Sequence, residues 1–203
     1  ANNVGIRATS GALVLLLNSD TIVPAGAIDR LAARLVDTPG AAAAGPRLVD
    51  DDGRIEISFG AMISPLAELR QKVRGALYAR GVASVVKRVQ AAAGREQFVD
   101  WVSGACLLVW RADAEAVGLL DERYFLYTED VDFCAALRTR ARRILFTPAA
   151  QITHRRGRSR ASAPDAMNAA YRRSQLAFYQ KHHPRWVPLL RLYLRVRGVA
   201  PRI

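Results

Sequence analysis

The chain has 203 residues, which is enough for one domain with a tail and a real hydrophobic core. Hydrophobic residues make up 51% and charged residues 24%, which excludes an intrinsically disordered chain. The formal net charge of +12 indicates an anionic partner, which could be nucleic acid, an anionic membrane or a phosphorylated substrate.

Targeting signals are absent from the sequence pattern. The N-terminal residues lack the basic and then apolar pattern of a secretion signal. No apolar run approaches the roughly 20 residues that cross a bilayer. We therefore expect a cytoplasmic protein, with attachment to the inner face of the plasma membrane as the alternative.

The first strong element is the apolar run at 12–17, which ends at Asn18-Ser19-Asp20. An unbroken run of this length predicts a buried central strand, followed by a helix at about 25–36 and a second strand at 41–49. Ligands of α/β sheets bind at the carboxyl ends of strands, where Asp20 can hold a divalent cation. A plain polar turn is the competing interpretation.

A basic helical stretch covers 65–93, and Gly75 and Gly81 are expected to break it. Residues 98–111 predict two short strands around Gly104. Trp101 lies three residues earlier, and its ring can stack on the apolar face of a sugar. A buried structural role for this tryptophan is the alternative.

Residues 121–130 predict a loop of acidic and aromatic residues, before a helix expected at about 129–140. Glu129 and Asp130 stand at the start of this helix, where acids also favour the helix dipole. The aromatic residues just before them favour a sugar-facing pocket wall instead.

Strands are expected at 144–146 and 150–154, ahead of an arginine-rich loop and two tail helices separated near Pro184. His154 ends the last strand, and Arg155 and Arg158 follow it. Arginines donate bidentate hydrogen bonds to phosphate, so these residues predict a metal or diphosphate site. The alternative is a surface histidine beside a solvated basic loop.

The alternation of strands and helices predicts an α/β layered fold. We expect a catalytic core at 1–160 and a C-terminal helical tail at 161–203.

The order of these motifs resembles the family 2 glycosyltransferases of the GT-A fold, particularly their rhamnosyltransferase-like branch. The resemblance covers roughly residues 1–182 and rests on several short motifs in order. They are Asn3-x-Gly5, the run ending in NSDT at 18–21, VSGA at 102–105, GLLDERYF at 118–125, YTEDVD at 127–132, and His154.

By this resemblance the fold would be a Rossmann-like mixed sheet with flanking helices. The activity would be inverting transfer of a sugar, with rhamnose one candidate, from a nucleoside-diphosphate sugar to a hydroxyl of a glycan or lipid-linked acceptor in cell-envelope polysaccharide synthesis. Asp130 is similar to the family's general base. Asp20 and His154 are similar to its ligands for Mg²⁺ or Mn²⁺. Trp101, Gly104 and Glu129 would lie on the acceptor side.

The sequence departs from the family pattern in two places. Asn18 replaces the first aspartate of the metal-binding DxD motif, which removes one carboxylate. The family's first two strand–helix units, which bind the nucleotide, would precede Ala1 and are absent from this chain. A catalytically inactive fragment is therefore one alternative.

Basic and apolar residues are interleaved at 65–93 and again at 185–202. This pattern is typical of a helix at an anionic membrane surface, although an amphipathic helix packed on the core is an equal alternative. A basic nucleic-acid-binding module is a rival function, but no nucleic-acid-binding motif occurs and no nucleic acid is expected. A sugar-nucleotide pyrophosphorylase should show a glycine-rich phosphate loop, which this chain lacks.

Overall fold

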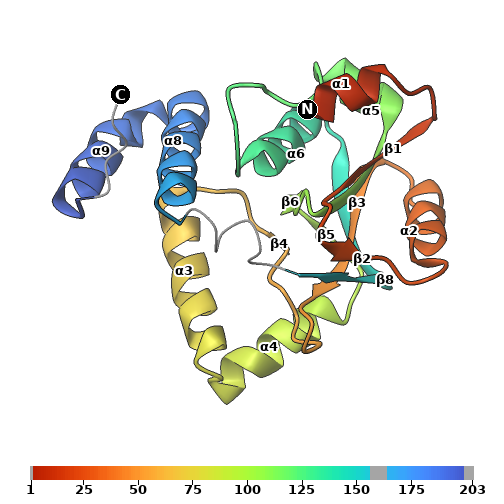
Figure 1. Ribbon diagram of the computed structural model, residues 1–203, viewed down its shortest axis with the longest axis horizontal. Coiled ribbons are helices and arrows are strands. Elements are labelled where there is room, and N and C mark those ends of the chain that lie inside the picture. Colours follow the sequence, from red (N-terminus) through yellow and green to blue (C-terminus); the bar gives the residue numbers. More distant parts are fainter. Residues whose placement is uncertain (1, 156–163, 199–203) are drawn as a thin grey trace.

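The computed structural model describes residues 2–155 and 164–198. Its centre is a six-stranded mixed sheet of order β1-β7-β3-β8-β2, with β5 beside β8 (Figure 1). The strands are β1 Leu13–Leu17, β2 Thr21–Ile22, β3 Ala41–Val49, β5 Gln97–Val99, β7 Cys106–Trp110 and β8 Arg143–His154. β3 and β8 run parallel, while the other pairs are antiparallel. The predicted α/β fold with a mixed sheet is confirmed.

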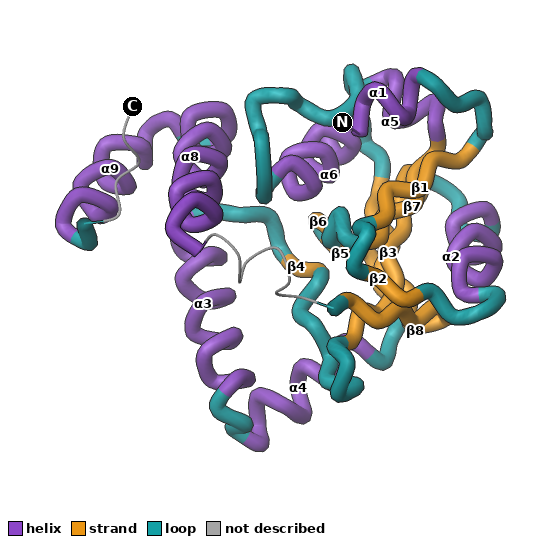
Figure 2. The backbone as a smooth tube through the Cα atoms, viewed as in Figure 1, coloured by secondary structure: helices purple, strands orange, loops and turns teal. Residues whose placement is uncertain are grey.

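Helices cover both faces of this sheet (Figure 2). On one face, Leu31 and Leu35 of α2 (Ala27–Val36) pack in a core cluster with Ile152 of β8. On the other face, α6 (Glu129–Thr139) contributes Phe133 and Leu137 to a separate core cluster.

The prediction of a buried central strand at 12–17 was wrong: β1 is an end strand of the sheet, and Leu17 is 43% exposed. A continuous apolar run indicates burial on both faces. Among the described residues, however, β1 pairs only with β7.

Four further helices lie to one side of the sheet and below it in the view of Figure 1. They are α3 Pro65–Ala79, α4 Ala83–Ala93, α8 Pro164–His182 and α9 Val187–Val196, with the 3₁₀ turn η1 Pro184–Trp186 before α9. α3 begins at Ser64, whose side chain accepts a hydrogen bond from the Ala67 amide, and Pro65 suits the first helical position. The predicted break at Gly75 was wrong, because α3 continues through it. The chain turns at Gly81, which has φ 72°.

Three parts of the chain differ from expectation. The two strands predicted within 143–154 form one strand, β8, whose pairing with β3 shifts register between Pro46 and Arg47. Residues 97–110 hold three strands, because β6 (Trp101–Val102) leaves the main sheet to pair with β4 (Phe59–Gly60). The third difference is the six-residue helix α1 (Asn2–Arg7). It lies beside α5 (Arg111–Ala116), whose Arg111 donates to the Ile6 carbonyl at 2.8 Å (Figure 1).

The C-terminal helices pack against the part of the chain that contains the sheet. Phe178 and Tyr179 of α8 and Leu194 of α9 belong to the same core cluster as Phe133 of α6. The division at residue 160 stays a prediction, and its boundary falls outside the described residues. No helix in the described ranges is long and apolar enough to cross a membrane.

Candidate active site

The ends of β1 and β8 bring two predicted metal ligands together. After β1 the chain turns through Asn18 and Asp20, and β2 then pairs Thr21 with His154 of β8. As a result, Asp20 Oδ1 lies 3.3 Å from His154 Nε2, and Asn18 Nδ2 lies 3.5 Å from the same nitrogen. The two residues are 134 positions apart in sequence, so only the sheet places them side by side.

Sequence reasoning missed a third member of this cluster, Glu56. Its Oε2 lies 2.9 Å from His154 Nδ1, the ring nitrogen opposite the one that faces Asp20. Glu56 is 8% exposed and His154 is 7% exposed. Glu56 lies in an irregular segment between β3 and β4, with no motif around it, so its role became visible only in three dimensions.

Asp130 stands at the first turn of α6 and reaches back to Gly104. Its Oδ2 accepts a 2.7 Å hydrogen bond from the Gly104 amide, and its Oδ1 accepts one of 2.8 Å from the Val131 amide. A Cβ on residue 104 would lie only 3.2 Å from the Asp130 Cβ. Glycine therefore allows the carboxylate to sit against the backbone, and the two amides fix its orientation.

Asp130 and the Asp20–His154 pair lie at the same end of the sheet. β1 and β7 are antiparallel, with Leu17 opposite Cys106, and the Asn18 amide donates to the Ala105 carbonyl at 3.0 Å. Gly104 is the neighbour of Ala105 in the chain. Two acidic groups that the sequence placed over 100 residues apart thus share one edge of the fold.

The backbone before α6 adopts a rare conformation. Tyr127 and Thr128 have φ 65° and 72°, in the left-handed region that residues other than glycine avoid. Such conformations cost on the order of 1–3 kcal/mol each and concentrate at functional sites. Their effect here is to start the helix abruptly, so that Glu129 and Asp130 occupy its first turn.

Glu129 has a different environment from its neighbour Asp130. Burial, and then the charge of Asp130, raises the pKa of Glu129 to about 7. Its Oε2 is buried and accepts no hydrogen bond from any described group. A carboxyl group with a pKa near neutrality can exchange a proton during a reaction.

The other predicted site residues have varied surroundings. Trp101 is 7% exposed, and its indole nitrogen donates to the Ala61 carbonyl at 2.8 Å, which favours the structural role weighed against sugar stacking. Arg155 is exposed and pairs with Asp51 at 3.0 Å, and its amide donates to the Asp20 carbonyl. Arg158 lies outside the described residues.

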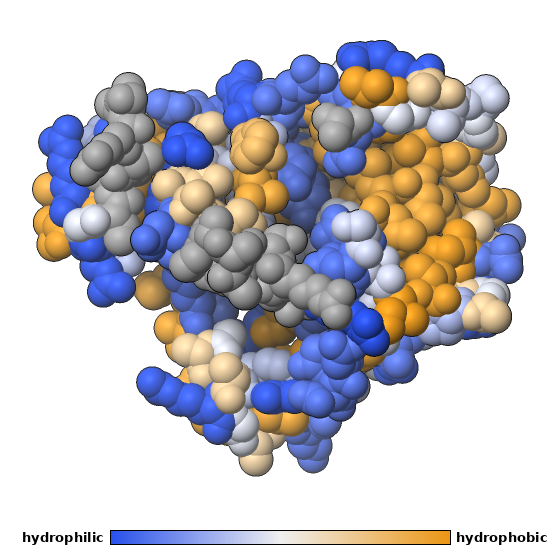
Figure 3. Space-filling model, viewed as in Figure 1, coloured by the Kyte–Doolittle hydropathy of each residue, from blue (hydrophilic) through white to orange (hydrophobic). Residues whose placement is uncertain are grey.

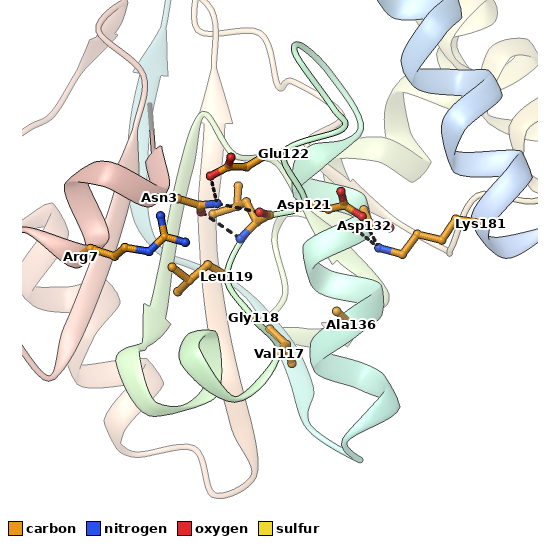
Figure 4. A pocket seen from close by; sticks show the side chains of 11 residues that line it. Asn3, Arg7, Val117, Gly118, Leu119, Asp121, Glu122, Asp132, Ala136 and Lys181 are labelled. Atoms are coloured by element: carbon orange, nitrogen blue, oxygen red, sulfur yellow. Dashed lines mark hydrogen bonds and ion pairs between the residues drawn. The ribbon is translucent and has the colours of Figure 1, made fainter.

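A buried network behind α6 was also missed. Asp132, 2% exposed, accepts from Tyr124 and lies 2.8 Å from Lys181 and 2.6 Å from His182 of α8. Figure 4 shows Lys181 reaching from α8 toward α6 at the edge of a cavity of about 440 Å³. The described residues around this cavity include none of the predicted site residues. It lies where α1, residues 117–122 and α6 meet, with Lys181 of α8 at its edge.

Comparison with known sequences identifies relatives among transferases. The family described as "Glycosyltransferase like family 2" matches residues 2–188. The N-acetylglucosaminyl-diphospho-decaprenol L-rhamnosyltransferase of Mycobacterium tuberculosis is 32% identical over 173 residues, which are 85% of this chain and 56% of that protein. Rhamnosyltransferase WbbL of Escherichia coli is 38% identical over 56 residues, 28% of this chain and 21% of its own. The chain thus spans about half the length of the mycobacterial relative.

Solved structures share the fold at low identity. GalNAc-T7, determined with UDP, GalNAc and Mn²⁺, matches 86% of this chain and 33% of its own, with a TM-score of 0.53 and 15% identity. The mannosyltransferase PcManGT of Pyrobaculum calidifontis, determined with GDP-Man and Mn²⁺, matches 94% of this chain and 46% of its own, with a TM-score of 0.52 and 13% identity. The fold is therefore of the GT-A type, and the family match over most of the sequence shows that this chain belongs to glycosyltransferase family 2.

Proposed function

We propose that the chain carries the catalytic base of an inverting glycosyltransferase, with a nucleoside-diphosphate sugar as donor. The observation that carries this proposal is the fixed Asp130 carboxylate at the same sheet end as Asp20 and His154. In this assignment, Asp130 accepts the proton of an acceptor hydroxyl while that oxygen attacks the anomeric carbon. The bond from that carbon to the diphosphate breaks on the opposite face, which inverts the configuration.

Asp20 and His154 are proposed to hold a divalent cation, Mg²⁺ or Mn²⁺. In the described ranges, no group of three or more His, Cys, Asp or Glu side chains is arranged as a complete metal site. Mg²⁺ in enzymes, however, is usually bound by one or two carboxylates plus substrate phosphates. Asp20 Oδ1 and His154 Nε2 lie 3.3 Å apart, so both atoms could face one cation. Such an ion would supply positive charge to the leaving diphosphate.

The donor sugar and the acceptor are proposed from the relatives. Both relatives named above are rhamnosyltransferases, and the name of the mycobacterial one specifies a diphospho-decaprenol carrier. We therefore propose rhamnose as the sugar and a lipid-linked glycan in cell-envelope synthesis as the acceptor. Glu129 and Gly104 are proposed on the acceptor side, and Arg155 and Arg158 near the diphosphate. A protein acting on such a lipid would work at the inner face of the plasma membrane.

Replacing the base tests the assignment. Asn at position 130 keeps an oxygen that can accept from the Gly104 amide, so Asp130→Asn should preserve the fold and donor binding. Because a general base contributes ~10²–10⁴-fold, turnover should fall by that factor. The measurements are transfer from nucleoside-diphosphate rhamnose with Mn²⁺, and donor affinity by calorimetry.

Asp29 of α2 provides the control, since it is a carboxylate in the first turn of a helix away from the site. Asp29→Asn should leave turnover unchanged. Unchanged turnover in Asp130→Asn, or no transfer by the unmodified protein from any nucleoside-diphosphate sugar, would reject the proposed function.

A further inference from the structure

We propose that Glu56 is a positioning residue for His154, and that it fixes which ring nitrogen is offered to a divalent cation. The inference rests on the proposed function only in naming the cation. The contact between the two side chains, 2.9 Å from Oε2 to Nδ1, is independent of it.

The local backbone explains why Glu56 occupies this position. The turn after β3 is held by Asp50, whose Oδ1 accepts from the amides of Asp52 and Arg54. The chain then returns beside β3, with Val49 bridged to Ile55 and the Glu56 amide donating 2.9 Å to the Leu48 carbonyl. Glu56 is therefore fixed between the ends of β3 and β8, the strand that carries His154.

The hydrogen-bond chemistry assigns the imidazole tautomer. An ionised carboxylate only accepts hydrogen bonds, so a neutral His154 that bonds Glu56 carries its proton on Nδ1. Nε2 then keeps its lone pair, and Asn18 Nδ2 approaches it as a donor at 3.5 Å. On the same side, Asp20 Oδ1 faces Nε2 at 3.3 Å. Two electron-rich atoms so close together suit a shared cation.

Burial strengthens the argument. Glu56 and His154 are both under 10% exposed, and a buried carboxylate is tolerated only with a partner. In metal sites, a carboxylate behind a ligating histidine orients the ring and makes the other nitrogen a better ligand. Replacing such a partner typically lowers metal affinity about tenfold to a hundredfold.

The experiment combines spectroscopy and binding on the full chain, without donor or acceptor. Nitrogen-15 NMR of histidine in the unmodified protein with Mg²⁺ should show that Nδ1 of His154 carries a proton and that Nε2 carries none. Mn²⁺ affinity, measured by calorimetry, should fall about tenfold to a hundredfold in Glu56→Leu. Glu56→Gln, which keeps an acceptor oxygen, should lose less.

Asp51→Asn is the matched control, because it removes the same charge from the same loop and Asp51 contacts Arg155 rather than the histidine. Its Mn²⁺ affinity should change by less than about threefold. If Nε2 is protonated in the unmodified protein, the inference is wrong, even if Glu56→Leu fails to fold. The inference is also wrong if a folded Glu56→Leu binds Mn²⁺ with the same affinity as the unmodified protein. Failure of transfer activity alone would reject the proposed function and leave this inference standing.

Discussion

At the scale of single residues, the neighbours Glu129 and Asp130 show how two adjacent carboxyl groups can have different surroundings. Asp130 receives backbone amides from Gly104 and Val131, while the buried Glu129 Oε2 has no hydrogen-bond partner among the described groups. Hydrogen bonds to a carboxylate stabilise its charged form, and burial destabilises it. The same pair of residue types therefore offers one oriented carboxylate and one group that resists ionisation.

The raised pKa of Glu129 predicts a pH-dependent penalty. Below its ordinary value of 4.5, the group is protonated in both states and contributes nothing. As the pH rises to about 7, the unfolded chain ionises first, so the folded state loses stability over this window and not beyond it. Glu129→Gln removes this ionisation penalty. The difference in free energy of unfolding between the variant and the unmodified protein should therefore grow in favour of the variant by on the order of 2 kcal/mol from pH 4 to pH 8. Urea unfolding at both pH values measures it, and a difference that does not change with pH would contradict it.

The sequence indicated most candidate site residues but not their interaction partners. Short motifs that can be recognised in the sequence contain Asp20, Asp130 and His154. The sheet then brings the strand ends together. Glu56 and Asp132 act through partners 98 and about 50 residues away, and no local pattern signals such pairs. The placement of Trp101 depended on β6 leaving the main sheet, which the sequence pattern did not show.

At the scale of elements, the boundaries of α6 and β3 followed from strong signals, since acids open α6, and β3 begins with four buried alanines and ends with Leu48 and Val49. The failures have physical causes. Gly75 lies within α3, and one glycine inside a helix costs only about 0.5–1 kcal/mol relative to alanine, which does not end the helix. The bulge that carries β8 through residues 148–150 is a feature of pairing with β3, and one strand alone does not reveal it.

The junction of α6 and α8 depends on Asp132. Lys181 and His182 both contact this buried carboxylate. Burial acts to lower the pKa of Lys181, but the hydrogen bonds of Lys181 to Asp121 and Asp132 raise it above its ordinary value. Breaking a buried pair leaves uncompensated charge and costs about 3–5 kcal/mol. Asp132→Asn should lower the free energy of unfolding by about 2–4 kcal/mol and accelerate amide exchange in α8.

Glu115 supplies the comparison for this prediction. Its side chain is 58% exposed and pairs with Arg111 at 3.6 Å. Glu115→Gln should change stability by less than about 1 kcal/mol, as exposed pairs do. Equal effects of the two substitutions in urea unfolding would show that the α6–α8 network contributes no more than a surface pair.

At the scale of the whole molecule, apolar side chains reach the surface in several regions, two of which differ in the charges around them. Figure 3 shows one over the side where β1 and α2 lie, with Leu17 and Ile22 each 43% exposed. The other is α9, where Val187, Leu190 and Leu194 are buried and a second apolar face stays exposed. Its exposed members are Trp186, Leu189, Leu192, Tyr193 and Val196.

Charge distinguishes the two regions. Exposed arginines surround the apolar face of α9 at positions 185, 191, 195 and 197, and no acidic residue follows Asp165. Around α2, the acids Asp29 and Asp37 accompany the arginines. Apolar side chains ringed by cations suit the surface of an anionic bilayer, where each basic residue near the surface contributes about 1 kcal/mol.

We therefore expect the protein to float with vesicles that contain anionic lipid. With neutral vesicles, it should stay at the bottom of the gradient. The double substitution Leu189→Ser and Leu192→Ser should reduce the bound fraction at least about tenfold, because the buried apolar contacts supply much of the affinity. Arg191→Gln with Arg195→Gln should weaken binding to anionic vesicles and make it less sensitive to salt. Val36→Ser is the control, since Val36 is 54% exposed on α2 and Leu189 is 56% exposed. If Val36→Ser released the protein as strongly as the α9 substitutions, membrane contact would reflect general surface hydrophobicity, and α9 would have no special role.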